Sequence, residues 1–213
     1  MIPFLAACNI SKARGSRWVV DQVSFTLQKS KVIHLRGANG AGKTTLLRIL
    51  AGEMAPSIGH VEIEGTQLGL APNEGRHRLA LVPEVLLPSP WLSVAEYLEF
   101  RADLRNLSSE LVEQVIEEWE FSPFSQRPMA TLSHGERRRV VVAAAMMAKP
   151  DILILDEPTV GMDSRQRDLL AKRLKEYSEG RVILVASHIE RQGLPDFDET
   201  LTLVDGRLES DEQ

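Results

Sequence analysis

The sequence predicts an α/β fold with a mainly parallel sheet, an N-terminal antiparallel β layer and an inserted helical lobe. Three observations carry this prediction. Short runs of alternating polarity come first, and uninterrupted apolar runs, each followed by a helical pattern, come later. Between them, residues 93–120 repeat at helical spacing. Apolar strands of this kind belong in a parallel sheet that is covered on both faces.

The N-terminal part supplies the antiparallel layer. Residues 4–7, 18–20 and 23–27 predict strands, and a further short alternating strand is expected at residues 59–65. Alternation with one polar face is typical of antiparallel sheets.

The rest of the chain predicts the core and the lobe. Residues 79–82 predict a central parallel strand, and about 85–130 together with the helix at 134–148 form the helical lobe. Ser93 and Glu96 form a capping box at the start of its first helix. A strand at 152–155, a helix at 164–178 opened by Asp163 or Ser164, and a strand at 182–185 follow. We treat residues 1–213 as one domain.

Composition limits the possible classes of protein. The 213 residues are 43% hydrophobic and 26% charged, as in soluble globular proteins. A net charge of −5 argues against nucleic acid as the main partner. The one cysteine, Cys8, excludes an internal disulfide and a thiolate metal site, which fits a reducing cytosol, and we expect it to be a small apolar residue in a first strand. No apolar run is long enough to span a membrane, so a membrane role would need a partner.

The most informative motif is a glycine-rich loop between a strand-like and a helix-like segment. Glycine-rich loops let backbone N–H groups surround a phosphate at the start of a helix. The lysine then reaches the terminal phosphates and the first threonine holds Mg²⁺. We therefore predict a P-loop NTPase core in which the nucleotide is bound by the residues of this loop: Gly37, Ala38, Asn39, Gly40, Ala41, Gly42, Lys43, Thr44 and Thr45.

Polar residues at two strand ends predict the second half of the site. Asp156 and Glu157 follow the apolar strand at 152–155, and ligands collect at the carboxyl ends of parallel strands. We expect Asp156 to hold Mg²⁺ and Glu157 to polarise the attacking water. His188 follows the next strand, 32 residues past Asp156, so it should emerge at the same edge. The other histidines have no comparable argument from placement: His34, His60, His77 and His134.

Ser133-His-Gly-Glu136 begins the helix that leads into the Asp156 strand. Ser133 and Glu136 fit a capping box, and Gly135 would leave the backbone open to close approach by an anion.

Together these motifs resemble those of an ATP-binding-cassette ATPase, in that family's order and spacing. The resemblance spans nearly the whole chain. It covers the phosphate loop, the signature at 132–136, the Walker B strand at 152–159, the D-loop at 160–163, the switch histidine His188 and a closing hairpin at 204–208.

The resemblance implies a mechanism and partners. Two chains, here expected to be identical, would sandwich two ATP and Mg²⁺ head to tail. Lys43, Glu157 and His188 of one chain would act with Ser133, Gly135 and Glu136 of the other. Hydrolysis would drive a separate membrane permease from the cytoplasmic face, and no nucleic-acid partner is expected.

Two positions depart from the family's commonest pattern. Glu84 stands where a metal-coordinating glutamine is usual, as in a subgroup of bacterial exporter ATPases. A carboxylate there could still coordinate Mg²⁺. At the position where an aromatic ring often stacks on adenine the chain has Arg14, and Trp18 is the nearest ring. Both residues remain candidates, because a guanidinium also stacks on bases.

Two other functions are compatible with a phosphate loop. A small-molecule kinase would leave the segment 132–136 unexplained. A soluble ATP-gated clamp on nucleic acid or ribosomes is disfavoured by the negative charge. The cargo stays open between drugs or polymers and the haem-exporter branch, which residues 35–40 resemble.

Overall fold

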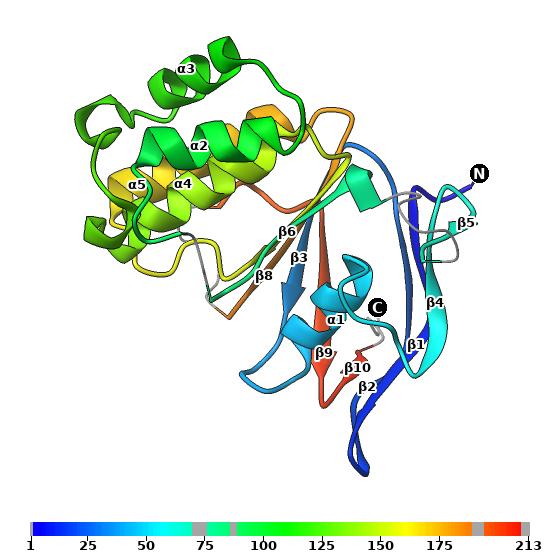
Figure 1. The fold of residues 1–213 in the computed structure, drawn as a ribbon. Coiled ribbons are helices and arrows are strands. Elements are labelled where there is room, and N and C mark those ends of the chain that lie inside the picture. Colours follow the sequence, from blue (N-terminus) through cyan, green and yellow to red (C-terminus); the bar gives the residue numbers. More distant parts are fainter. Residues whose placement is uncertain (1, 70–75, 86–88, 189–193, 210–213) are drawn as a thin grey trace.

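Helix α1 (Lys43–Leu50) lies between two β-sheets, and its apolar residues pack against both (Figure 1). A computed structural model of the chain describes residues 2–69, 76–85, 89–188 and 194–209. The core around α1 contains Leu46 and Leu50 of the helix, Ile10 of the first sheet and Ile33 of the second. Each such fully buried aliphatic side chain contributes about 1.5–3 kcal/mol relative to exposure.

The first sheet is antiparallel, as predicted. Its order is β2-β1-β4-β5, built from β1 (Leu5–Arg14), β2 (Arg17–Leu27), β4 (Ile58–Ile63) and β5 (Thr66–Gln67). The separate strands expected at 18–20 and 23–27 are one strand. Gln22 adopts φ 53 within it, and the pairing with β1 shifts register nearby. This irregularity lets the strand continue across the break in the sequence pattern.

The second sheet is mainly parallel, which confirms the predicted core. Its order is β10-β9-β3-β8-β7-β6, and only β10 pairs antiparallel. The expected position of β6 was wrong, because it is an edge strand of the described sheet. Its ends are apolar because Val82 packs in the helical core and Leu79 in the core around α1. The strands are β3 (Lys31–Arg36), β6 (Leu79–Val82), β7 (Ile152–Asp156), β8 (Val182–Ser187), β9 (Glu199–Val204) and β10 (Arg207–Leu208).

Four longer helices gather at the opposite face of the parallel sheet from α1 (Figure 1). They are α2 (Val94–Asp103), α3 (Ser109–Glu118), α4 (His134–Met147) and α5 (Ser164–Tyr177), with short 3₁₀ turns at Arg76–Arg78, Ser122–Phe124 and Met129–Thr131. The capping boxes expected from Ser93 and Ser133 are both formed, and Asp163 caps α5. Residues 86–88 of the expected lobe lie outside the described residues.

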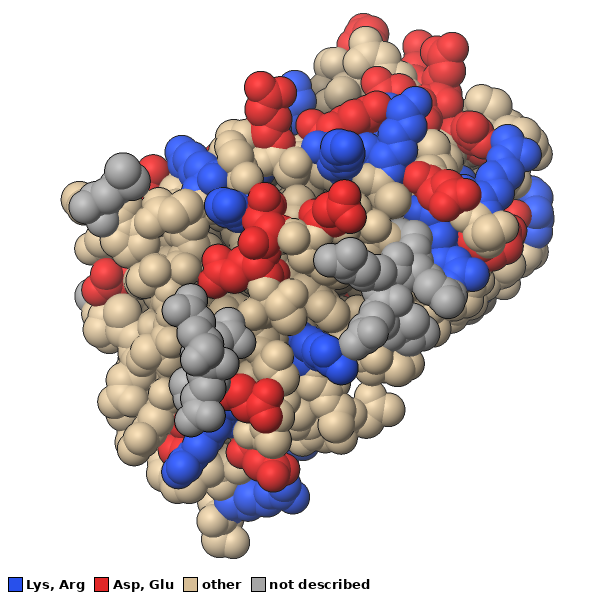
Figure 2. Space-filling model, turned by 180° about the vertical axis from the view of Figure 1, so that it is seen from behind, with Lys and Arg blue, Asp and Glu red and all other residues tan. Residues whose placement is uncertain are grey.

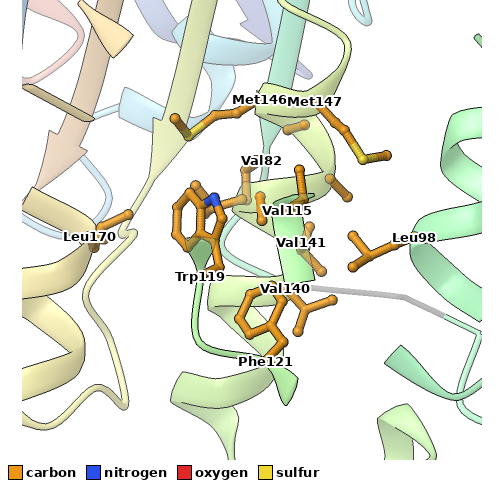
Figure 3. Close-up of a cluster of buried hydrophobic side chains, with 14 of the residues drawn as sticks. Val82, Leu98, Val115, Trp119, Phe121, Val140, Val141, Met146, Met147 and Leu170 are labelled. Atoms are coloured by element: carbon orange, nitrogen blue, oxygen red, sulfur yellow. The ribbon is translucent and has the colours of Figure 1, made fainter. Parts of the chain in front are cut away.

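Helix α4 is buried on nearly all sides and joins the other helices to the sheet. It packs against α2, α3 and α5 and against β6. Figure 3 shows Val140 and Val141 of α4 beside Trp119 and Phe121, whose rings lie 6.1 Å apart. Arg139 extends over the Phe121 ring at 5.5 Å. Helix α4 therefore connects the packing of α2 and α3 to the parallel sheet.

The helices and the surface charge bear on a membrane or nucleic-acid role. None of the helices among the described residues has the length and apolar character needed to cross a bilayer. On the face shown in Figure 2, acidic and basic side chains intermingle over the helical end.

Candidate active site

The glycine-rich loop connects β3 to α1, and two of its glycines are required by close backbone approaches. Gly42 precedes α1 with φ 104, and a Cβ there would lie 2.4 Å from the carbonyl oxygen of Val19. A Cβ at Gly37 would lie 2.5 Å from the carbonyl oxygen of Leu203. Any other residue would push the loop away from β2 or β9. The loop therefore holds its shape through contacts with both sheets.

Lys43 is the first residue of α1 and lies over the loop. Its side chain is buried, and Nζ donates to the carbonyl oxygens of Gly37 at 2.7 Å and Ala38 at 3.2 Å. These acceptors are neutral. A phosphate at the start of α1 would offer the ammonium a stronger, charge-assisted hydrogen bond.

Thr44 and Asp156 meet although 112 residues separate them. The Thr44 hydroxyl donates to Asp156 Oδ2 at 2.7 Å. Burial raises the pKa of Asp156 above its ordinary value, and the hydrogen bond from Thr44 partly opposes this. A hydroxyl and a carboxylate are hard oxygen donors of the kind that Mg²⁺ prefers. A nearby cation would also compensate the buried carboxylate, so these residues fit a Mg²⁺ site.

Glu157 and His188 come from adjacent strand ends and form a hydrogen-bonded pair. His188 Nδ1 lies 2.8 Å from Glu157 Oε1, and the backbone N–H of His188 donates to the same oxygen at 3.0 Å. Glu157 is buried and adopts φ 49, and its own N–H donates to the carbonyl of Ala186 at 2.9 Å. Residues other than glycine seldom adopt this left-handed backbone conformation, and such strained residues cluster at functional sites.

These residues line one cavity of about 530 Å³. It brings together most of the predicted site: Asn39, Gly40, Gly42, Lys43, Thr44, Thr45, Glu84, Asp156, Glu157 and His188. Both adenine candidates, Arg14 and Trp18, also line it, and Trp18 is 44% exposed. Ser133, Gly135 and Glu136 are not among the described residues that line this cavity.

Ser133 and Glu136 form their capping box at the start of α4. Glu136 N–H donates to Ser133 Oγ at 3.1 Å, and Ser133 N–H donates to Glu136 Oε2 at 2.8 Å. Tertiary packing, which the sequence pattern does not show, requires glycine at position 135. A Cβ there would lie 2.5 Å from the carbonyl oxygen of Gly161. Close packing against the loop after β7 therefore requires a glycine here in addition to the close approach by an anion that the sequence pattern suggested.

Arg138 supports the site through buried hydrogen bonds, and the sequence motifs did not indicate it. Its side chain is fully buried in α4. Nη1 donates to the backbone carbonyl of Asp156 at 2.9 Å, and Nη2 donates to that of Glu84. Burial lowers the pKa of Arg138, and the charges of Glu84 and Asp156 oppose that shift. The guanidinium thus joins the end of β7 to the segment after β6.

The sequence also missed part of the cavity wall, namely Arg17, Val19, Asp205 and Gly206. Gly206 N–H donates to the carbonyl of Ala41 at 3.0 Å, and its own carbonyl accepts from Asp21 N–H at 2.8 Å. The sequence pattern predicts a turn at Asp205-Gly206. Its place beside the phosphate loop depends on β10 lying next to β2.

Comparisons with known proteins agree with this geometry. Residues 20–160 match the family model described as ABC transporter. The linearmycin resistance ATP-binding protein LnrL of Bacillus subtilis is 32% identical over 189 residues, which are 86% of this chain and 61% of that protein. A Nod factor export ATP-binding protein I of Cupriavidus metallidurans is 37% identical over 193 residues, which are 88% of this chain and 64% of that protein.

The chain therefore spans 61% and 64% of the lengths of these two relatives. A solved structure of the ATP-binding subunit of an ABC transporter superposes with a TM-score of 0.86 at 27% identity, over 97% of this chain and 88% of that one. The motifs, the fold and the relatives agree. The chain belongs to the ABC transporter family and has the fold of its ATP-binding cassettes.

Proposed function

We propose that this chain is the ATP-binding and hydrolysing subunit of an ABC transporter. Two copies would close around two ATP molecules and drive a separate membrane permease. The observation that carries the proposal is the common cavity, in which the phosphate loop, the Thr44–Asp156 pair and the Glu157–His188 pair face the same space.

Each residue in the cavity has a role that follows from its chemistry. Lys43 and the loop N–H groups bind the β- and γ-phosphates. Thr44 and Asp156 would hold Mg²⁺, with Glu84 at the same wall of the cavity, and a bound ion there would supply positive charge to the phosphate oxygens. Glu157 accepts a proton from the water that attacks the γ-phosphorus. The bond between that phosphorus and the β–γ bridging oxygen breaks, giving ADP and phosphate.

His188 has a positioning and a binding role. It fixes one oxygen of the Glu157 carboxylate, and 43% of its side chain is exposed. From there it can also donate a hydrogen bond to the γ-phosphate.

One chain supplies only part of each catalytic site in this proposal. Ser133 is exposed at the start of α4 and lies outside the cavity of its own chain. In a two-fold dimer, Ser133, Gly135 and Glu136 of a second copy would complete the phosphate site. The γ-phosphate then bridges both copies, so its hydrolysis removes contacts that favour the closed dimer.

The transport role rests on the family and on the relatives. The name of the Cupriavidus relative states that it serves Nod factor export, and we propose export for this chain as well. The chain would act at the cytoplasmic face of the membrane, bound to its permease beside α2 and the segment that carries Glu84. Residues 1–213 would form one cassette domain with the lobe at about 85–130 and α4.

A mixing experiment tests the shared site directly. Lys43→Ala disables the phosphate loop. Ser133→Asp keeps a capping acceptor at the start of α4 but places a negative charge against the partner's phosphate. Each variant alone should hydrolyse little ATP. In an equimolar mixture, half of the dimers combine both variants and contain one intact site, so roughly a quarter of the wild-type rate should return. Activity confined to the levels of the separate variants would contradict the composite site.

The partner is tested separately. Affinity-tagged chain carrying Glu157→Gln, extracted from membranes in detergent with ATP, should retain a protein with many membrane spans. Recovery with ribosomes or nucleic acid would instead favour the ATP-gated clamp. The negative net charge of −5 disfavours the clamp.

A further inference from the structure

The structure places three side chains of different metal-binding character together on the antiparallel sheet. The donor atoms of Cys8, His60 and Glu62 all lie within 4.8 Å of one another. Cys8 belongs to β1, and the other two belong to β4. These residues take no part in the nucleotide cavity.

Strand register accounts for the cluster. Cys8 pairs directly with His60, and Glu62 follows His60 by two positions, so it points to the same face. The intervening pairs, Ala7 with Val61 and Leu5 with Ile63, point into the core around α1. The three polar side chains therefore lie on the face of the sheet turned away from that core, where all three are half-buried.

The pairing of β1 with β4 is irregular beside the cluster, and this irregularity fixes the local backbone conformation. The register of β1 against β4 shifts after Cys8, and Asn9 adopts φ 50. Opposite it, Gly59 adopts φ 84, and a Cβ there would lie 2.3 Å from the carbonyl oxygen of Cys8. β-Bulges re-aim side chains and fix the local register. The spacing of Cys8 and His60 is thus set by the main chain, and only short side-chain movements are needed to bring the donors together.

The open hollow next to the cluster gives access from solvent. It has a volume of about 690 Å³ and is lined by Cys8, Asn9, Ser24, Gly59 and His60, among others. Burial and the nearby charge of Glu62 raise the pKa of the Cys8 thiol. His60 Nε2 lies 2.9 Å from Glu62 Oε1, which shows that the imidazole and the carboxylate already face each other.

We propose that Cys8, His60 and Glu62 form a binding site for a divalent transition metal ion, with Zn²⁺ as the ion that suits them best. A thiolate, an imidazole and a carboxylate are the three ligand types that tetrahedral zinc takes in proteins. Mg²⁺ and Ca²⁺ prefer oxygen ligands throughout and would leave the sulfur and nitrogen donors unused. Water would fill the fourth position. The bound ion would cross-link β1 to β4.

The proposed site differs from an expectation from the sequence. A single cysteine was expected to exclude a thiolate metal site, and Cys8 was expected to be a small apolar residue in a first strand, where β1 does contain it. The structure instead leaves Cys8 partly exposed beside two further donors. Cys8 is separated from His60 and Glu62 by more than 50 positions in the sequence, so no spacing motif indicates the three donors together.

Cobalt titration tests the proposal, because Co²⁺ bound to a thiolate absorbs in the near ultraviolet. Cys8 is the only cysteine of the 213 residues, so any such band reports on this residue alone. The nucleotide-free, reduced full chain should bind one Co²⁺ per chain with this band, and Zn²⁺ should displace it. Cys8→Ser should abolish the band. His60→Gln and Glu62→Gln should each weaken binding by at least about 10-fold.

His77→Gln is the matched control, because this imidazole is exposed outside the cluster. It should bind Co²⁺ as the wild type does. Excess Zn²⁺ should raise the melting temperature of the wild type and of His77→Gln, but not that of Cys8→Ser. Three outcomes would each overturn the proposal. The Co²⁺ band could be missing, or the His60 and Glu62 variants could bind Co²⁺ as tightly as the wild type. The third is one metal ion bound per two chains, with the ion cross-linking the pair. All variants should hydrolyse ATP normally, so failure here is separable from failure of the proposed function.

Discussion

Glu157 and His188 meet through one carboxylate oxygen, which accepts hydrogen bonds from the backbone N–H of His188 at 3.0 Å and lies 2.8 Å from its ring nitrogen Nδ1. The two residues directly follow neighbouring parallel strands, β7 and β8, that are joined by α5. The geometry fixes the carboxylate at the edge of the sheet where the phosphate loop also lies. In the proposed function, this carboxylate is the group that would accept a proton from water.

Replacement of Glu157 by glutamine should separate ATP binding from hydrolysis. The amide oxygen of Gln can accept the same two hydrogen bonds, so the site should keep its shape. The amide cannot take up a proton, and loss of a general base lowers rates by about 10²–10⁴-fold. Phosphate release measures the rate, and light scattering with Mg²⁺ and ATP should show accumulated dimer.

The control for that variant is Glu176→Gln, which removes a carboxylate whose side chain is 50% exposed on α5. It should hydrolyse ATP at the wild-type rate. A Glu157→Gln protein with wild-type turnover would show that another group activates the water.

Loss of the Lys43 ammonium should weaken nucleotide binding. Its charge-assisted hydrogen bonds to phosphate are each worth about 1.5–3 kcal/mol, so Lys43→Ala should lose at least about 10-fold in ATP affinity by calorimetry. Lys172→Ala removes a lysine that is 66% exposed on α5 and should bind ATP as the wild type does. Unchanged binding by Lys43→Ala would contradict the assignment of the phosphate site.

The buried guanidinium of Arg138 should stabilise the fold. Arg138→Met keeps most of the side-chain volume but leaves the carbonyl oxygens of Asp156 and Glu84 without their donor. The Asp156 carbonyl is buried, and an unsatisfied buried acceptor costs about 1–3 kcal/mol, partly offset by relief of the buried charge. We expect a net loss of about 2 kcal/mol in the free energy of unfolding, measured with urea.

Arg165→Met provides the comparison, because Arg165 is 84% exposed and makes a surface ion pair with Glu120. It should change stability by less than about 1 kcal/mol. If Arg138→Met proved as stable as the wild type, the free energy cost of burying the charge would equal the free energy that its hydrogen bonds contribute, and Arg138 would not stabilise the fold.

A methyl group at Gly135 should destabilise the chain even in the absence of nucleotide. The added Cβ would lie 2.5 Å from the Gly161 carbonyl oxygen, and main chain cannot yield cheaply. Overpacking of this kind costs about 1–3 kcal/mol. Ser109→Ala, at an exposed position in the first turn of α3, should stay within about 0.5 kcal/mol. Equal stability of the Gly135→Ala protein would show that the loop around Gly161 can move to accept the methyl group, and would contradict the packing argument.

Local patterns predicted much of the site because its parts lie at the ends of regular elements. The loop at 37–45 stands between a strand and a helix, and Asp156 and His188 end successive strands. A strand–helix–strand unit brings its strand ends to one edge of a parallel sheet, so the sequence order was enough to bring these residues together. The position of β6 was not predictable in this way. A short apolar run suits an edge strand as well as a central one when helices cover it.

By itself, the sequence determined the phosphate loop, the acidic residues after β7 and the family, since each depends on residues close together in the chain. Tertiary structure alone decided that Arg138 is buried with its guanidinium on the carbonyls of Asp156 and Glu84, that Gly135 packs on Gly161, and that Cys8 faces His60 and Glu62. These relationships depend on strand register and on helix packing between distant segments. One residue of register shift would turn Cys8 to the other face, and no local pattern encodes that choice.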